Sequence, residues 1–207
     1  MRFFLDSASV EEARRIKDLA LLDGVWLSIA AAEEAGVEYR RAVRELAALS
    51  DGPILVETGA DDPKGMYKEG RELAKLGKDV VVRLPLKPEG LRVARLLAED
   101  QIATCAAACF STSQALIAAK ANLSYVAPAV GPLDDVGSIG MDLVEQVIRV
   151  YDNYGFQTQI VVSEARNPIH VLDAALMGAD VAALPAAVLE QLFRHPFSAE
   201  LRTGRPS

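Results

Sequence analysis

The feature that most constrains this chain is a regular alternation of short apolar runs with longer segments of helical period. Eight such runs occur along the 207 residues, and their mean spacing of about 26 residues leaves room for one helix and two short loops after each. The predicted strands are Phe3–Asp6, Val25–Ser28, Ile54–Thr58, Val80–Leu84, Thr104–Cys109, Tyr125–Val130, Ile160–Ala165 and Val181–Leu184. Successive apolar positions within these runs are typical of strands buried on both faces, so the pattern predicts an α/β protein with parallel strands.

Helical segments fill the gaps between these runs. Ser9 and Glu12 have the spacing of a capping box, and Gly24, Gly77 and Gly155 stand where helices should return to strands. The predicted helices include Val10–Leu22, Glu38–Leu49, Lys64–Leu76, Leu91–Glu99, Ser113–Ala121 and Met141–Tyr151. Eight strand–helix units without a linker predict a single domain, residues 1–207, closed as a (β/α)8 TIM barrel. An open doubly wound sheet is the alternative, although no G-x-G-x-x-G motif follows the first strand.

Composition argues against several classes of partner. Lys and Arg total 22 against 29 Asp and Glu, which gives a formal charge of -7, and no long basic run would attract nucleic acid. No apolar run approaches the length of a membrane span, and the first residues lack the layout of a signal peptide. We therefore expect a cytoplasmic protein that binds neither nucleic acid nor membranes.

Disulfide and metal chemistry is not expected either. Cys105 and Cys109 lie four residues apart in one predicted strand, a separation too large for a disulfide, so they should be reduced thiols. The two histidines, His170 and His195, form no cluster with metal-ligand spacing. The sequence therefore predicts no metal site and no cofactor.

Polar and charged residues gather at the carboxyl ends of the predicted strands, where barrels of this type carry their chemistry. Alternation places Trp26 with Ser28, and Glu164 with Arg166, on the same side of their strands. We expect this set to line one mouth of the barrel and to bind a small molecule. The residues are Asp6, Trp26, Ser28, Glu57, Arg83, Ala107, Ala129, Glu164 and Arg166.

Arg83 has two interpretations that are compatible with each other. In the first, it forms a structural ion pair with Glu57 or Glu164, because a buried charge needs a partner. In the second, it anchors an anionic or carbonyl ligand, and Glu57 or Glu164 acts as general base if burial raises its pKa. Trp26 either packs in the core or forms a flat wall for a ligand ring, and Asp6 is either a catalytic group or a polar plug.

Several short motifs are spread along the chain from Phe3 to Pro196. They include Asp23-Gly24-Val25, Val80-Val81-Val82-Arg83-Leu84-Pro85, Glu89-Gly90-Leu91, Tyr125-Val126-Ala127-Pro128, Leu133-Asp134-Asp135 and Arg166-Asn167-Pro168-Ile169-His170. In order and spacing they resemble the transaldolase and fructose 6-phosphate aldolase family, in its short form. The resemblance implies a (β/α)8 barrel that assembles as a homo-oligomer, commonly a pentamer or decamer.

The resemblance also implies a reaction whose central residue this chain lacks. Such enzymes attack a ketose with a lysine on the fourth strand, and the resemblance places Arg83 at that position. A guanidinium stays protonated and cannot attack a carbonyl, so it cannot replace the lysine. The resemblance implies further differences. This chain has Trp26-Leu27-Ser28-Ile29 where the family usually has Thr-Thr-Asn-Pro, Ala107 where it has a threonine, Pro132 where it has an arginine and Glu164 where it has a serine.

Asp6, Glu57 and Arg166 remain at positions that are functional in the family. The family's C-terminal helix would continue past Pro196, where this sequence instead ends in the polar stretch Arg202–Ser207. In relatives that helix helps to cover the site or a neighbouring subunit. We therefore expect this chain to differ from them in how its site is covered and in how its subunits assemble.

These differences leave three hypotheses open. In the first, the barrel is repurposed for acid–base chemistry, with Glu164 or Glu57 as base and Arg83 stabilising negative charge. In the second, the protein binds or assembles without catalysis, and Arg83 is held by a carboxylate. In the third, aldolase or transaldolase activity in carbohydrate metabolism survives through another lysine, of which Lys87 is the nearest, although its loop position lacks the burial that lowers a lysine pKa.

Overall fold

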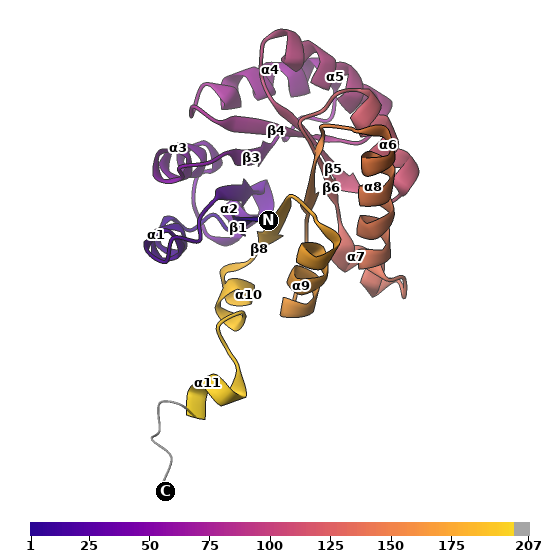
Figure 1. Ribbon diagram of the computed structural model, residues 1–207. Helices are drawn as coiled ribbons and strands as arrows, with labels where there is room; N and C mark the ends of the chain where they lie inside the picture. Colours follow the sequence, from indigo (N-terminus) through magenta and orange to yellow (C-terminus); the bar gives the residue numbers. More distant parts are fainter. Residues whose placement is uncertain (201–207) are drawn as a thin grey trace, which may run out of the picture.

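The computed structural model describes residues 1–200, which form a closed barrel of eight parallel strands (Figure 1). Each strand pairs with the next one in the chain, and β8 pairs with β1. The strands are β1 (Arg2–Asp6), β2 (Gly24–Leu27), β3 (Ile54–Glu57), β4 (Val80–Pro85), β5 (Thr104–Cys109), β6 (Tyr125–Pro128), β7 (Gln159–Val162) and β8 (Val181–Leu184). The pairing of β1 with β8 confirms the predicted single-domain TIM barrel and overturns the open-sheet alternative, since an open sheet would leave two unpaired edges.

Helices lie outside the strands (Figure 1). They are α1 (Val10–Asp18), α2 (Ile29–Glu34), α3 (Tyr39–Leu49), α4 (Pro63–Ala74), α5 (Pro88–Glu99), α6 (Thr112–Lys120), α7 (Val130–Asp135), α8 (Gly140–Tyr154), α9 (Pro168–Met177), α10 (Ala186–Gln191) and α11 (Pro196–Glu200). The predicted helices are all present, with ends shifted by up to four residues. The sequence did not predict α2 and α7, because helices of six residues are too short to show a helical period.

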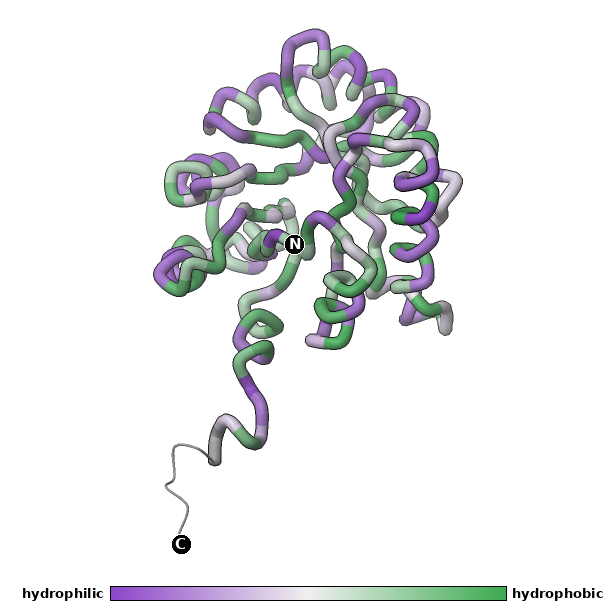
Figure 2. The backbone as a smooth tube through the Cα atoms, viewed as in Figure 1, coloured by the Kyte–Doolittle hydropathy of each residue, from purple (hydrophilic) through white to green (hydrophobic). Residues whose placement is uncertain are grey.

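The inward-facing side chains of the strands fill the barrel. Phe4, Trp26, Leu55, Val81 and Tyr125 belong to one interior cluster, and the rings of Phe4 and Tyr125 meet edge to face with centroids 6.5 Å apart. The outward-facing residues of the strands pack against the helices in two larger clusters. Figure 2 shows the resulting apolar colour of the strands. The interior is therefore a packed core, and chemistry is confined to the two ends of the barrel.

Polar side chains fix where the first helix begins. The Ser9 hydroxyl accepts a hydrogen bond from the Glu12 amide at 3.2 Å, as the predicted capping box requires. The Glu12 carboxylate, however, accepts from the Ser7 hydroxyl at 2.6 Å, and the Ser9 amide donates to that same hydroxyl at 3.0 Å. Ser7 thus stands between the two partners that a capping box would join directly.

Four predicted strands end earlier than the sequence suggested, and for β3 the difference is the single residue Thr58. β2 ends at Leu27 because Ser28 caps α2, with its hydroxyl accepting from the Ala31 amide at 3.0 Å. β6 ends at Pro128 because α7 begins at Val130, and β7 ends at Val162. A further irregularity lies in β5, where the register shifts between Ala106 and Cys109. The side chains that follow β2, β6 and β7 therefore do not continue the alternation predicted for these strands.

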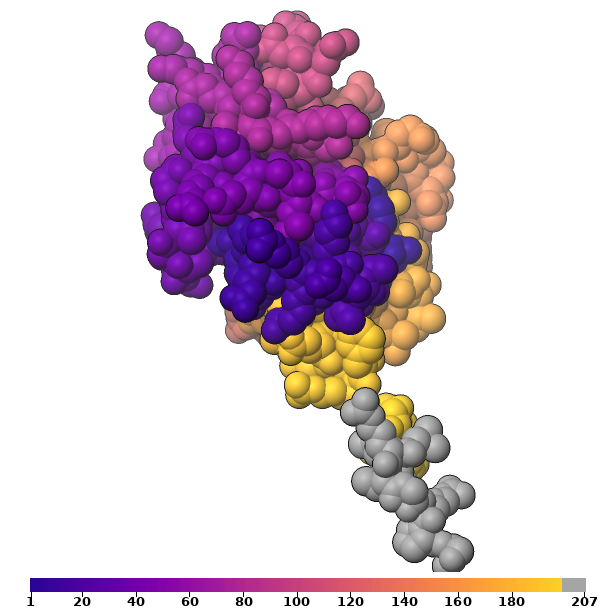
Figure 3. All heavy atoms as spheres, turned by 90° about the vertical axis from the view of Figure 1, so that its left-hand side faces the viewer, coloured from indigo at the N-terminus to yellow at the C-terminus, as the bar shows by residue number. Residues whose placement is uncertain are grey.

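The C-terminal helices leave the barrel. α10 packs near the body, whereas α11 extends away from it in both views (Figures 1 and 3). The end of the predicted domain and the polar stretch Arg202–Ser207 lie outside the described residues. Within residues 1–200, none of the helices combines the length and the apolar character needed to cross a bilayer.

Candidate functional site

Arg83 lies at the carboxyl end of β4 and is almost completely buried, with 4% of its surface exposed. Its Nη2 donates to Glu57 Oε2 at 2.9 Å and to the carbonyl of Leu27 at 2.8 Å. The register of the sheet explains the pairing, because Arg83 and Glu57 stand opposite each other on β4 and β3. Of the two carboxylates considered from the sequence, Glu57 is therefore the ion-pair partner of Arg83.

Glu57 is itself held in place by two neighbours. Its Oε1 accepts from the Ile29 amide, at the first residue of α2, at 2.6 Å. The Tyr39 hydroxyl accepts from the Glu57 amide at 2.7 Å and donates to the Glu57 carbonyl at 2.9 Å. Both carboxylate oxygens of Glu57 are thus engaged, one by a helix start and one by Arg83.

Tyr39 is a member of the site that the sequence analysis missed. It lies at the beginning of α3, outside the strand ends, and its apolar ring fits the helical period of that segment. Burial of the hydroxyl raises the pKa of Tyr39 above its ordinary value, so it remains a neutral donor and acceptor. No sequence signal at Tyr39 distinguishes it from an ordinary packing residue.

Trp26 lies beneath the guanidinium. Arg83 Cζ stands 3.9 Å from the centroid of the Trp26 ring, and the indole is 7% exposed within the interior cluster. A guanidinium over an indole face gains cation–π attraction, which partly compensates for the loss of water around the charge. In this arrangement Arg83 occupies the ring face that the sequence interpretation offered to a ligand.

One nitrogen of Arg83 remains without a partner. Its Nε is buried and makes no hydrogen bond within the described residues. A buried N–H that gives up water without finding an acceptor is costly, and such groups are uncommon in native structures. Arg83 therefore packs against Trp26 and pairs with Glu57 while its Nε donor has no acceptor. A buried donor without an acceptor calls for an explanation, and a functional role of the side chain is one.

Asp6 completes the cluster from the end of β1. Burial raises the pKa of its carboxyl to about 6, the positive charge of Arg83 acts in the lowering direction, and the negative charges of Glu164 and Glu57 raise it. A carboxyl with a pKa near 6 exchanges protons efficiently at neutral pH, unlike an ordinary aspartate. Asp6 therefore has the proton affinity of an acid–base group.

Glu164 and Arg166 do not lie on the strand, so the prediction that alternation aligns them was wrong. Glu164 adopts a left-handed backbone with φ of 56° beyond the end of β7. Arg166 points to Asp135, with 2.6 Å between Nη1 and Oδ1, and its Nη2 lies 3.7 Å from Glu164. Both side chains are about half exposed. They form an outer charged rim, and the negative charge of Glu164 raises the pKa of Asp6 in the inner site.

The three small residues of the predicted site have different surroundings. Ser28 uses its hydroxyl to cap α2, as described above. Ala107 is half buried opposite Pro85, and Ala129 is buried and bridges to Ser163. The structure therefore brings together Asp6, Trp26, Glu57 and Arg83, with Ala107 and Ser28 at neighbouring strand ends. Within residues 1–200, no group of three His, Cys, Asp or Glu side chains is arranged to hold a metal ion.

The cysteines and Lys87 lie apart from this chemistry. Cys105 and Cys109 are both buried and are not joined to each other. Burial raises the pKa of the Cys109 thiol to about 11, so it is not an activated nucleophile. Lys87 is exposed at the start of α5.

A closed eight-stranded barrel with a buried ion pair at the carboxyl ends of its strands has the architecture shared by (β/α)8 enzymes. The chain belongs to the transaldolase/fructose-6-phosphate aldolase family, whose model matches residues 3–203.

Individual relatives agree with this membership. The chain is 45% identical to a protein named "Probable transaldolase" from Aquifex aeolicus (strain VF5), over 96% of this chain and 91% of that one. It is 42% identical to a "Probable transaldolase" from Geobacter sulfurreducens, over 96% and 92% of the two chains. Among solved structures, the N-acetylmannosamine-6-phosphate 2-epimerase from Clostridium perfringens is similar with a TM-score of 0.64 and 13% identity, covering 98% of this chain and 91% of that one. Identity this low shows a shared fold alone.

Proposed function

We propose that this protein binds a small carbonyl compound at the carboxyl end of its barrel and moves a proton next to the carbonyl, without forming a Schiff base. The observation that carries this proposal is the buried Arg83 guanidinium, paired with Glu57, beside a carboxyl whose pKa is raised to about 6. The resemblance of the Arg83 motif to the family's lysine motif supports it, because a guanidinium has no free electron pair with which to attack a carbonyl.

Each residue then has one role. Asp6, as carboxylate, takes a proton from the carbon next to the carbonyl, and the C–H electron pair moves into a new C=C bond while the carbonyl oxygen gains negative charge. Arg83 stabilises that oxygen. The hydroxyl on the deprotonated carbon then gives its proton to the same oxygen and becomes the new carbonyl, while the proton held by Asp6 returns to the former carbonyl carbon, which restores Asp6 and completes an isomerisation. Asp6 suits this role better than Glu57, whose oxygens are engaged, or Glu164, which is half exposed.

The charges of the site favour an uncharged ligand over a phosphate ester. Glu57, Glu164 and Asp6 all place negative charge at this mouth. The positive charges are Arg83, which is paired with Glu57, and Arg166 on the rim, which is paired with Asp135 and lies near Glu164. A phosphate dianion would meet a carboxylate at Glu164, where the resemblance implies a family serine, and like charges at close range cost binding free energy. We therefore expect hydroxyketones and hydroxyaldehydes without phosphate to bind in preference to their phosphate esters.

Two alternatives remain as outcomes of the test. Retained transaldolase or aldolase activity would agree with the names of the relatives and would need a lysine such as the exposed Lys87. A binding protein without catalysis is favoured by the ion pair itself, since Glu57 already neutralises Arg83.

Proton exchange and covalent trapping together separate these functions. With dihydroxyacetone in deuterated water, we expect the protein to exchange the protons next to the carbonyl, with a rate that rises with pH through about 6 as Asp6 ionises. Asp6→Asn should abolish the exchange, and Arg83→Gln should reduce it by about two orders of magnitude, as for other single donors to a developing oxyanion. Asp18→Asn, an exposed carboxylate on α1, is the matched control.

Borohydride reduction in the presence of dihydroxyacetone then tests the Schiff base. We expect no covalent adduct on the protein by intact mass. An adduct on the unmodified chain would refute the proposal in favour of a surviving lysine mechanism, and the absence of exchange with hydroxyketones would identify a non-catalytic protein. An adduct that forms only on Arg83→Lys would show that the carbonyl pocket is retained and that Arg83 stands at the former nucleophile position.

A further inference from the structure

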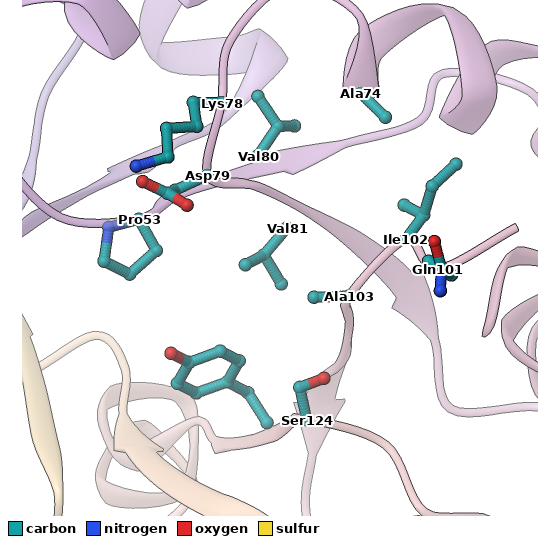
Figure 4. Close-up of a pocket in the computed structure, with 11 residues that line it drawn as sticks. Pro53, Ala74, Lys78, Asp79, Val80, Val81, Gln101, Ile102, Ala103 and Ser124 are labelled. Carbon is teal, nitrogen blue, oxygen red and sulfur yellow. The ribbon is translucent and has the colours of Figure 1, made fainter.

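A pocket of about 520 Å³ opens at the amino ends of β3 to β6, at the opposite end of the barrel from Arg83 (Figure 4). We infer that this pocket binds a small zwitterion with an apolar side chain, that is, a free α-amino acid of the leucine or phenylalanine class. The residues around it include Lys78, Asp79, Val81, Gln101, Ala103 and Tyr125.

The floor of the pocket is the lowest layer of the barrel core. Val81 and Tyr125 are members of the interior cluster, and both are buried, as is the Phe4 ring that meets Tyr125 edge to face. Between them β5 is preceded by Ala103, whose methyl group leaves the space that a larger side chain would fill. Ala103 is thus a small side chain at the edge of an apolar floor formed by buried residues of the barrel core.

The rim of the pocket carries one charge of each sign. Lys78 and Asp79 are both exposed, and neither forms an ion pair with another residue among those described. Figure 4 shows the amine of Lys78 and the carboxylate of Asp79 on the side of the pocket near Pro53, with Gln101 on the far side. The two charged groups thus lie together at one margin of the pocket, and within residues 1–200 neither is engaged in an ion pair that would remove it from the rim.

This pair of charges selects the class of ligand. An anion would be attracted by Lys78 and repelled by Asp79, and a cation would experience the reverse. A zwitterion brings its ammonium and carboxylate groups a few ångströms apart, so it alone is attracted by both residues. Its side chain would then lie on Val81 and Ala103, where burial of apolar surface adds to the binding free energy.

The size of the pocket fits this class. Small-molecule sites have volumes of about 300–1,000 Å³ and combine an apolar lining with a few polar groups. A pocket of about 520 Å³ admits one amino acid with a branched or aromatic side chain and some water. Gln101 and Ser124 add neutral donors and acceptors on the rim without changing its charge balance.

Calorimetry with three probes tests the inference on the unmodified full-length chain. L-leucine carries both charges, 4-methylpentanoate only the carboxylate, and 3-methylbutylamine only the ammonium. We expect L-leucine to bind and each singly charged analogue to bind at least about tenfold more weakly, because each analogue loses one attraction and keeps the repulsion by the residue of like charge. Analogue affinities equal to that of leucine, or no binding of leucine or phenylalanine at up to about 10 mM, would overturn the inference.

Variants locate the binding. Lys78 and Asp79 lie on the surface, and Lys78→Gln and Asp79→Asn should each weaken leucine binding at least about tenfold. Two control variants, Lys75→Gln at the end of α4 and Asp18→Asn, should leave leucine binding unchanged. Ala103→Leu should abolish binding by filling the floor, with its folding checked by thermal unfolding. Leucine affinity that is unchanged in both Lys78→Gln and Asp79→Asn would refute the site.

Discussion

The charged side chains at the two ends of this barrel differ in burial and in pairing. At the carboxyl end, Arg83 is buried, paired with Glu57 and left with one unsatisfied nitrogen. At the amino end, Lys78 and Asp79 are exposed over an apolar floor. Buried charges must be organised by the surrounding fold and so are energetically coupled to it, whereas exposed charges are available to a ligand at little cost to stability. The difference predicts where substitutions will unfold the protein and where they will only change binding.

Removing Glu57 should have the largest effect. Glu57→Ala leaves the buried Arg83 without its counterion and the start of α2 without an acceptor, so we expect a loss of about 3 kcal/mol in the free energy of unfolding. The double variant Glu57→Gln with Arg83→Met should recover most of this loss, because no uncompensated charge remains. Urea denaturation measures both. A loss below about 0.5 kcal/mol in Glu57→Ala would show that Arg83 reaches water once the pair is broken.

Asp6→Asn should stabilise the protein in a way that depends on pH. Because burial raises the Asp6 pKa from 3.8 to about 6, the folded state binds a proton more tightly than the unfolded state, and ionisation destabilises the fold as pH rises between these values. Two pKa units correspond to somewhat under 3 kcal/mol, and partial exposure reduces this to about 2 kcal/mol at pH 7.5.

At pH 3.5 the carboxyl is largely protonated in both states, so most of this advantage should vanish. Denaturant unfolding of the two proteins at each pH makes the comparison, with Asp18→Asn as the exposed control. An equal effect of Asp6→Asn at both pH values would indicate a change in packing, not a buried charge.

Tyr39→Phe should have an intermediate effect. The hydroxyl accepts from the Glu57 amide and donates to the Glu57 carbonyl, so its removal leaves both backbone groups without that partner. We expect a loss of about 1.5 kcal/mol, the cost of unsatisfied part-buried groups. Tyr67→Phe, whose hydroxyl contacts Asp100 at the surface, is the matched control and should change stability by less than about 0.5 kcal/mol. Similar losses in the two variants would remove Tyr39 from the support of the site.

The barrel itself was predictable because strand and helix periods are local. Eight apolar runs at even spacing leave few other ways to bury both faces of each strand, and the strand ends Asp6, Trp26, Glu57 and Arg83 were placed together by that regularity. The choice of Glu57 over Glu164 was not predictable, because it depends on β7 ending at Val162 and on the left-handed turn at Glu164.

Other features depend on contacts between segments that are distant in the sequence. Tyr39 reaches Glu57 across 18 residues, and nothing in the sequence around it marks that contact. The amino-end pocket is lined by residues from the starts of several strands, among them Ala103 and Tyr125, and the sequence around each gives no sign of a cavity. Periodicity predicts which residues share a face, but it does not reveal which of them touch or where space remains.

The smallest expected effect on stability is at the amino end of the barrel. Asp79→Asn removes an exposed charge that forms no ion pair among the described residues, so the free energy of unfolding should change by less than about 0.5 kcal/mol. The same variant should weaken leucine binding at least about tenfold. A stability change as large as that of Glu57→Ala would mean that the amino end, like the carboxyl end, is organised around its charges. A small change with lost binding would leave Asp79 as a recognition group on a scaffold whose stability does not depend on it.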